Sequence, residues 1–146
     1  MIGLGCAIGS VLVGNTQDIA KARHLRKSLG GGMRQSGYLA AAGLYALTHN
    51  VTRLQEDHLH ATWLAQTLTK NELIDVITVN PDTNIVVFGF HDNNRFNAID
   101  IVSLLKTQYN VWVNAMAGNR IRAVTHLDVK YEDVVHAARM INELVM

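Results

Sequence analysis

Cationic side chains gather around a run of three glycines near the start of this 146-residue chain. Lys27 precedes the glycines at 30–32 and Arg34 follows them, and five Lys or Arg residues fall between positions 21 and 34. Glycine permits positive φ and a close approach of the backbone, and the free N–H groups at the start of a helix favour an anion. Lys27 and Arg34 are therefore candidate ligands of a phosphate group. A solvated basic turn is the alternative for the same pattern.

A second cationic pair lies in the β-branched context around position 122. Arg120 and Arg122 alternate with apolar residues, so in a strand they share one face. A charged side chain in such a strand needs a partner or an exit to solvent. The pattern leaves two alternatives open: a ligand-binding arginine, with Arg120 as the rival of Arg122, or an outward arginine on an edge strand.

The histidines and the single cysteine do not form a recognisable site. His58 and His60 are two residues apart, so on a helix their rings point to different sides and cannot chelate zinc together. His126 is expected to be a hydrogen-bonded core or rim residue. Cys6 is expected to be a small core side chain, and one cysteine excludes an internal disulfide and fits a reducing, cytoplasmic compartment. No metal site is predicted.

The periodicity of the chain predicts an ordered series of helices and strands. The residues around 35–48 are small and apolar nearly all round, which is typical of a buried helix that can also serve a subunit interface. Asn15 or Thr16 is the expected N-cap of the first helix, and Thr52 with Gln55 is a possible capping box for the third. Helices are predicted at 17–29, 35–48, 52–69, 98–108 and 131–145, and strands at 10–13, 74–79, 84–90, 111–113 and 121–125.

This order of elements indicates an α+β layer in the second half, with helices on one face of a largely antiparallel sheet. The last helix is expected to turn a set of apolar residues inward, namely Val134, Val135, Ala138, Ile141 and Leu144. The chain is expected to divide near residue 70. The glycines at 3, 5 and 9 lack a preceding strand and a following helix, which excludes a dinucleotide-binding fingerprint.

Composition limits the class of protein further. Hydrophobic residues make up 49% of the chain and charged residues 17%, which suits a globular domain with large buried faces. The net charge of +1 does not indicate a nucleic-acid or membrane partner. Residues 1–14 are mostly apolar, but glycines interrupt them and they are shorter than the roughly 20 residues of a membrane span. We expect them to form a buried loop and strand.

Several segments together resemble one known family. They are Gly3-Leu4-Gly5, IGSVLVG at 8–14, RHLRKSLGGGMRQSGYLAAAGLYAL at 23–47, the helix at 54–68 and IRAVTHLDV at 121–129. They are similar to the C-terminal half of the low-specificity L-threonine aldolases, which are pyridoxal-phosphate lyases of the aspartate-aminotransferase-like α/β fold. The resemblance implies that residues 1–70 are the C-terminal part of the large cofactor domain, and that residues 71–146 are a small α+β C-terminal domain.

The resemblance also implies roles for single residues. Lys27 and Arg34 match positions that bind the cofactor phosphate at a subunit interface, and Arg122 matches the arginine that holds the substrate carboxylate. Ile2 stands where the family has its cofactor-binding lysine, directly before Gly-Leu-Gly. This chain is therefore expected to lack a catalytic lysine and to bind no pyridoxal phosphate covalently.

Two functions follow as hypotheses. In the first, the chain is a fragment of a threonine-aldolase-like protein, whose family reaction cleaves L-threonine or L-allo-threonine to glycine and acetaldehyde, and it is inactive alone. In the second, it is a non-catalytic oligomerisation module that associates with itself or with a full-length paralogue. A homo-oligomer is expected in either case. An unrelated anion-binding domain remains the third alternative.

Overall fold

The computed structural model describes residues 3–92 and 95–146. The chain divides into two compact units, Met1–Val51 and Thr52–Met146. The second unit begins before the third helix because that helix packs against the strands and the last helix that follow it. The division expected near residue 70 refers to the domains of the whole family fold and stays a prediction.

The first unit contains two helices, α1 (Thr16–Ser28) and α2 (Gly37–His49). Asn15 is the N-cap of α1: its side chain accepts a hydrogen bond from the backbone N–H of Asp18 at 2.9 Å and donates one to the Asp18 carboxylate at 2.7 Å. These contacts satisfy one free donor of the first turn. Residues 10–13 were predicted to be a strand, and this prediction is wrong. No strand in the described part of the chain pairs with them, and they remain irregular.

Helix α2 is more exposed than its sequence predicts. Of its residues, all of which are described, only Ala46 is buried, whereas Leu44 is 67% exposed and Tyr45 is 62% exposed. The prediction of a buried helix is therefore wrong for this chain, since burial requires a covering partner as well as apolar residues. Cys6 is buried as expected.

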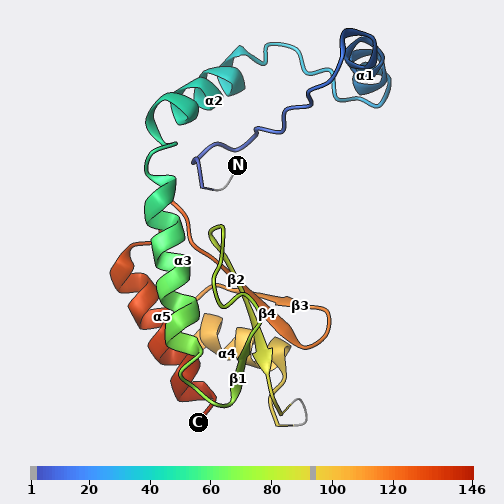
Figure 1. Cartoon of the computed structure of the whole chain (residues 1–146). Coiled ribbons are helices and arrows are strands. Elements are labelled where there is room, and N and C mark those ends of the chain that lie inside the picture. The colour runs from blue at the N-terminus through green and yellow to red at the C-terminus, as the bar shows by residue number, and fades with distance from the viewer. Residues whose placement is uncertain (1–2, 93–94) are drawn as a thin grey trace. The chain divides into compact units, whose positions relative to one another are not determined.

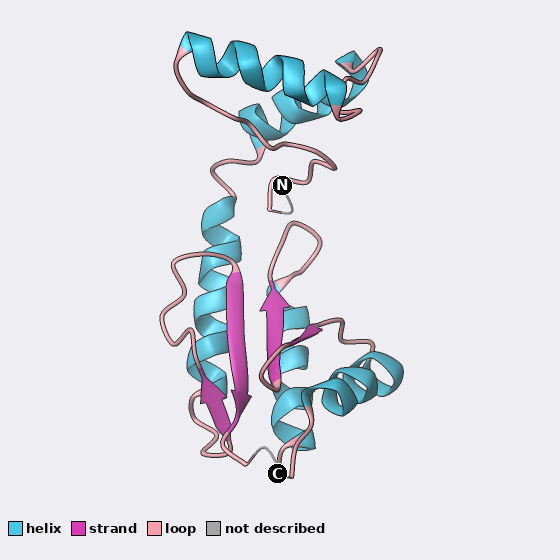
Figure 2. Cartoon of the chain, turned by 90° about the vertical axis from the view of Figure 1, so that its right-hand side faces the viewer, coloured by secondary structure: helices cyan, strands magenta, loops and turns pink. Residues whose placement is uncertain are grey.

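The second unit contains three helices and a four-stranded antiparallel sheet (Figure 1). The strand order is β1-β2-β4-β3, so β1 and β3 are the edge strands. Figure 2 shows the same strands in magenta with helices beside them. The elements are α3 (Leu54–Leu68), β1 (Ile74–Val76), β2 (Ile85–Phe90), α4 (Ala98–Tyr109), β3 (Asn114–Met116), β4 (Arg120–Val124) and α5 (Tyr131–Leu144).

The helices cover one face of this sheet, as the sequence predicts. Alternate residues of β2 and β4 point into a single apolar core that also includes side chains of α3, α4 and α5. Phe88 and Ile121, which face each other across the two strands, are both fully buried. The opposite face of β4 carries the arginines, so the period-2 alternation predicted for this strand is confirmed.

Three local predictions differ from the structure. The strand expected at 111–113 lies at Asn114–Met116, next to the turn at 117–119 that joins it to β4. Thr52 does not cap α3, because the N-cap position is Arg53 and makes no side-chain cap hydrogen bond. In α5, Val135 is exposed and Met140 is buried instead.

Hydrogen bonds of two residues, Asp57 and Asn119, connect elements of the second unit. Asp57 is fully buried and accepts hydrogen bonds from both terminal nitrogens of Arg53, at 2.9 and 3.3 Å, while its main-chain oxygen accepts one from the Thr125 hydroxyl at 2.6 Å. Asn119, with a φ of 55°, accepts from the Ala98 N–H at 2.6 Å and donates to the Phe96 carbonyl at 2.8 Å. The Thr125 hydrogen bond ties α3 to the end of β4, and the Asn119 hydrogen bonds tie the β3–β4 turn to the start of α4.

No described helix is both long enough and apolar enough to cross a lipid bilayer.

Candidate functional site

The glycine turn after α1 favours glycine at two positions. Gly30 has a φ of +83°, which favours a residue without a side chain. A Cβ on Gly31 would lie 3.1 Å from the main-chain oxygen of Arg26, whose carbonyl accepts a hydrogen bond from the Gly31 N–H at 2.7 Å. The chain therefore folds back tightly onto the last turn of α1.

This turn places one candidate cation on each side. A Cβ on Gly32 would lie 3.5 Å from Cγ of Lys27, so the backbone after the turn passes along the Lys27 stem. Arg34 was predicted at the start of the next helix, but it lies in a turn just before Ser36, the N-cap of α2. Both side chains are exposed, and neither forms an ion pair with any described residue. Two cations without an internal counter-ion beside a tight glycine turn can bind an anion.

Arg122 lies in the second unit, so it is described separately from Lys27 and Arg34. It sits on the exposed face of β4, where Val87 of β2 and Asn114 of β3 are its register partners. The sequence left open an outward arginine on an edge strand, but β4 is an inner strand with β2 on one side and β3 on the other. An exposed guanidinium at the middle of a sheet face is available to a carboxylate from outside the chain.

Arg120 shares this face but has a different neighbourhood. A Cβ on Gly89 would lie 3.7 Å from Cγ of Arg120, so the stem of Arg120 lies against the Gly89 backbone. Neither arginine forms an ion pair among residues 3–92 and 95–146. Arg122 lies closer to the centre of the sheet face, while Arg120 lies beside the β3–β4 turn.

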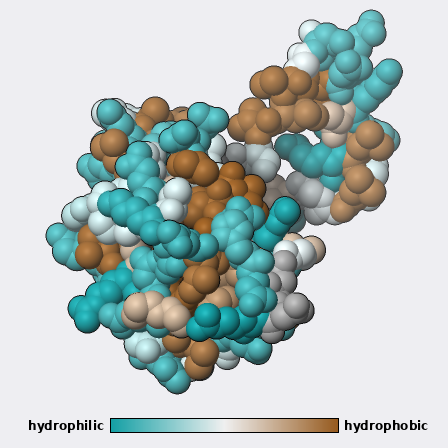
Figure 3. Space-filling model, turned by 60° about the horizontal axis from the view of Figure 1, so that its bottom comes forward, coloured by the Kyte–Doolittle hydropathy of each residue, from teal (hydrophilic) through white to brown (hydrophobic). Residues whose placement is uncertain are grey.

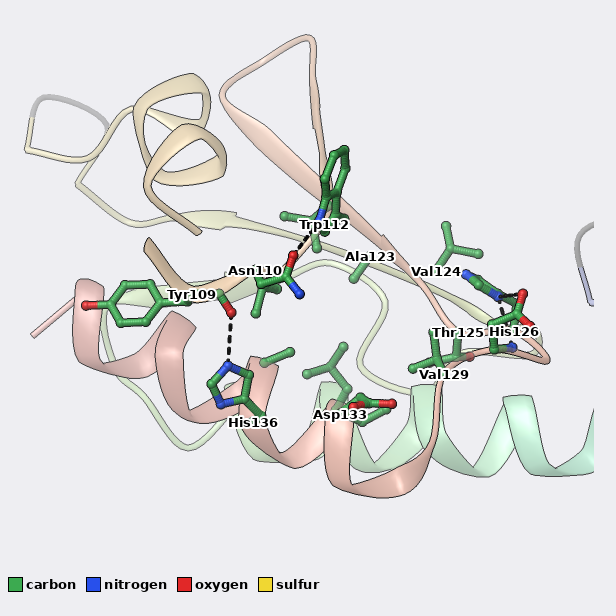
Figure 4. A pocket seen from close by; sticks show the side chains of 16 residues that line it. Tyr109, Asn110, Trp112, Ala123, Val124, Thr125, His126, Val129, Asp133 and His136 are labelled. Atoms are coloured by element: carbon green, nitrogen blue, oxygen red, sulfur yellow. Dashed lines mark hydrogen bonds and ion pairs between the residues drawn. The ribbon is translucent and has the colours of Figure 1, made fainter. Parts of the chain in front are cut away.

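The sequence did not point to a pocket of about 410 Å³ in the second unit (Figure 4). Trp112 and His136 belong to its wall: the Trp112 indole N–H donates to Asn110 at 3.0 Å, and His136 Nε2 lies 3.1 Å from the Tyr109 carbonyl oxygen. Ala123 also lines the pocket and points to the opposite side of β4 from Arg122. Neither Arg120 nor Arg122 is among the residues that line this pocket. Its residues lie far apart in the sequence, so no local motif predicts it.

The three histidines considered in the sequence differ in burial. His126 is half-buried, accepts a hydrogen bond from the Asp128 N–H at 3.3 Å and lies 3.6 Å from the Asp128 carboxylate, as expected for a rim residue. His58 is exposed on α3, whereas His60 is half-buried.

Comparison with known proteins decides the family. The sequence model of the beta-eliminating lyases matches residues 2–92, which is more than half of the chain. The chain belongs to the beta-eliminating lyase family. It is also 46% identical over 136 residues to the low specificity L-threonine aldolase of Escherichia coli strain K12, a match that covers 93% of this chain and 38% of that protein. The chain thus spans well under half the length of this curated relative.

Solved structures agree on the fold of this beta-eliminating lyase family member. A candidate aromatic amino acid beta-eliminating lyase/threonine aldolase from Exiguobacterium sp. 255-15 superposes with a TM-score of 0.67 at 15% identity, over 97% of this chain and 42% of that one. The cystine C–S lyase C-DES superposes with a TM-score of 0.59 at 22% identity, over 73% of this chain and 28% of that one. One C-DES variant holds glycine covalently linked to its pyridoxal phosphate cofactor, and pyridoxal phosphate is the cofactor of the family.

The residues of this beta-eliminating lyase family member suit the phosphate end of that cofactor. Lys27 and Arg34 supply exposed cationic donors, and the tight turn at Gly31 brings the backbone close without a side chain in the way. Such a set of donors matches a phosphate group. Ile2, at the expected lysine position, lies outside the described residues, so the absence of a covalent link stays a prediction.

Proposed function

We propose that this chain is part of a threonine-aldolase-like protein of the cytoplasm, a pyridoxal-phosphate enzyme that cleaves L-threonine or L-allo-threonine to glycine and acetaldehyde. In this proposal the first unit is the end of the large cofactor domain of an aspartate-aminotransferase-like fold, and the second unit is its small α+β domain. The 46% identity to the Escherichia coli threonine aldolase carries the proposal. With Ile2 at the lysine position, the chain alone is inactive.

Each proposed residue has one task. Lys27 and Arg34 neutralise and hold the cofactor phosphate, and Arg122 binds the substrate carboxylate with its planar guanidinium. When bound, pyridoxal phosphate supplies an electron sink for the bond that breaks. The exposure of all three side chains, and the lack of an ion-pair partner for them in the described chain, supports these tasks.

A chimaera tests the proposal. We expect threonine cleavage when the preceding segment of the Escherichia coli enzyme is fused to this chain together with Ile2→Lys, and none from the chain alone. In the chimaera, Arg34→Ala should weaken cofactor binding, and Arg122→Ala should raise KM for threonine. The cofactor affinity and the KM should each change by about ten- to hundredfold, since a charge-assisted hydrogen bond contributes about 1.5–3 kcal/mol. Equilibrium dialysis of the cofactor and steady-state kinetics separate the two effects.

The chain offers matched controls for this test. Arg23→Ala removes an exposed cation of α1 and should leave cofactor binding unchanged, and Arg120→Ala should leave KM within about twofold. If Arg120→Ala raises KM and Arg122→Ala does not, the carboxylate role belongs to Arg120. Cleavage activity in the unmodified chain would refute its proposed inactivity.

A second function, as an oligomerisation module, is favoured by the apolar surface of the first unit. Tyr38 and Leu47 on α2 are 86% and 55% exposed, and Val11 and Val13 before α1 are each 83% exposed. Figure 3 shows hydrophobic residues, in brown, at the molecular surface. Large apolar side chains left exposed on one unit are typical of an interface.

We expect the chain to self-associate through α2. Replacing Leu44 and Leu47 together by glutamate should shift sedimentation from oligomer to monomer, because two charges would then be desolvated in the contact. Ile99→Glu is the control, since Ile99 is 68% exposed on α4 in the other unit. A wild-type chain that sediments as a monomer at working concentration would contradict a function as an oligomerisation module.

A further inference from the structure

A second hollow, of about 430 Å³, lies on the outer side of α3 where α5 begins. Its walls include Trp63 and Tyr131, whose rings meet edge to face with centroids 5.3 Å apart and planes at 73°. His60 lies beside Tyr131, with ring centroids 5.9 Å apart, and Glu56 stands at the rim. We call Trp63, Tyr131, His60 and Glu56 the aromatic corner.

The aromatic corner is not part of the proposed aldolase chemistry. The α3 side chains that face the core are Ala61, Leu64, Ala65 and Leu68, whereas the corner uses the outer side of the helix. Arg122 lies on the sheet face that the helices do not cover. The corner is therefore a separate feature of the second unit.

The chemistry of the corner suits a cation. The face of an aromatic ring is negative, so two rings at a steep angle can attract a positive group from two sides. Glu56 adds a carboxylate whose side chain is 65% exposed. Arg53 lies 3.6 Å from that carboxylate, but its closer contact, at 2.9 Å, is with the buried Asp57. The rim of the hollow thus keeps an accessible negative group.

The chain's other tryptophan provides an internal comparison. Trp112 is covered by a cation of the protein itself, with Lys106 Nζ 4.1 Å from the ring centroid. Among the described residues, only Lys106 over Trp112 and Arg95 over Phe96 make such contacts, so no cation of the described residues lies over the Trp63 or Tyr131 ring. In addition, His60 Nδ1 is buried and has no hydrogen-bond partner in the described chain. A buried polar atom without a partner is unusual and is a reason to examine a site for a ligand.

We propose that the aromatic corner binds a quaternary ammonium group of a small organic cation. A primary ammonium carries three N–H donors that need acceptors, whereas the two rings and Leu59 offer apolar contact to methyl groups beside the exposed Glu56 carboxylate. A quaternary ammonium has no N–H donor, and its methyl groups carry the charge against the ring faces.

Titration of the whole chain with tetramethylammonium and with choline tests this site, observed by NMR of the two tryptophan indole N–H groups. We expect saturable shifts of the Trp63 signal and a much smaller response of Trp112. The neutral alcohol 3,3-dimethylbutan-1-ol has the shape of choline without its charge, and it should bind about three- to thirtyfold more weakly. Equal binding of choline and the alcohol would show an apolar hollow only and would overturn the proposal.

Variants assign the binding to its residues. Tyr131→Leu should abolish the choline-dependent shift of Trp63, and Glu56→Gln should weaken binding severalfold and reduce its salt dependence. Trp112→Leu is the matched control and should leave the Trp63 titration unchanged. Retained choline affinity in Tyr131→Leu would refute the site. Trp63→Leu, followed through the backbone amides of α3, provides a second check that uses no tryptophan signal.

Discussion

Replacing Asp57 by alanine is expected to destabilise the second unit by about 3–5 kcal/mol, because it leaves a largely buried Arg53 guanidinium without its carboxylate. Asp57 is fully buried and Arg53 is 18% exposed, so water cannot replace the lost contact fully. Both tryptophans lie in the second unit, and their emission during urea denaturation therefore reports on this unit alone. The urea concentration at the midpoint of unfolding should fall, with little change in the slope of the unfolding free energy against urea concentration.

Glu56→Ala is the control for this experiment. Glu56 contacts the same guanidinium at 3.6 Å but is 65% exposed, so its loss should change the free energy of unfolding by less than about 1 kcal/mol. If the two variants are equally stable, the buried ion pair does not stabilise the start of α3.

Asn119→Ala is expected to destabilise the same unit by about 2–4 kcal/mol. The substitution leaves the Ala98 N–H and the Phe96 carbonyl without their side-chain partner, which costs about 1–3 kcal/mol. It also places a Cβ-bearing residue without a local hydrogen bond at a φ of 55°, which adds about 1 kcal/mol.

Asn119→Gly separates these two contributions. Glycine tolerates the positive φ but makes no side-chain hydrogen bond, so it should recover about 1 kcal/mol relative to alanine. The same urea titration, read from tryptophan emission, measures all three proteins. Wild-type stability in the alanine variant would show that the turn is held by other contacts.

The helices could be predicted from sequence because their signals are local. Asn15 caps α1 and Asn97 caps α4 through side-chain contacts within three residues of the cap. The apolar period of α5 likewise identifies Val134, Ala138 and Ile141 as core residues. Such features depend on neighbours along the chain, so sequence alone contains them.

The exact position of β3 and the burial of α2 could not be predicted in the same way. Residues 111–113 have the β-branched pattern of a strand, but the ladder forms at Asn114–Met116, where the β3–β4 turn sets the register. Helix α2 is apolar, but its burial depends on a surface that its sequence does not specify. Both outcomes are determined by partners distant from the element.

The candidate site was predictable only in part. Spacing around the glycines singled out Lys27 and Arg34 as an anion site, and alternation placed Arg120 and Arg122 on one face. The roles in phosphate binding and in carboxylate binding were assigned to these residues by the resemblance to a family. The aromatic corner escaped prediction because Trp63 and Tyr131 are far apart in sequence and meet only when α5 packs beside α3.

The short edge strands affect how the second unit behaves at high concentration. Both β1 and β3, which end the sheet, are three residues long, whereas the inner strands β2 and β4 have six and five. A long, unpaired edge is a template for strand addition by another molecule, and short edges limit such growth. We therefore expect any association of this chain to proceed through side-chain contacts, without the rise in thioflavin T fluorescence that accompanies cross-β fibrils.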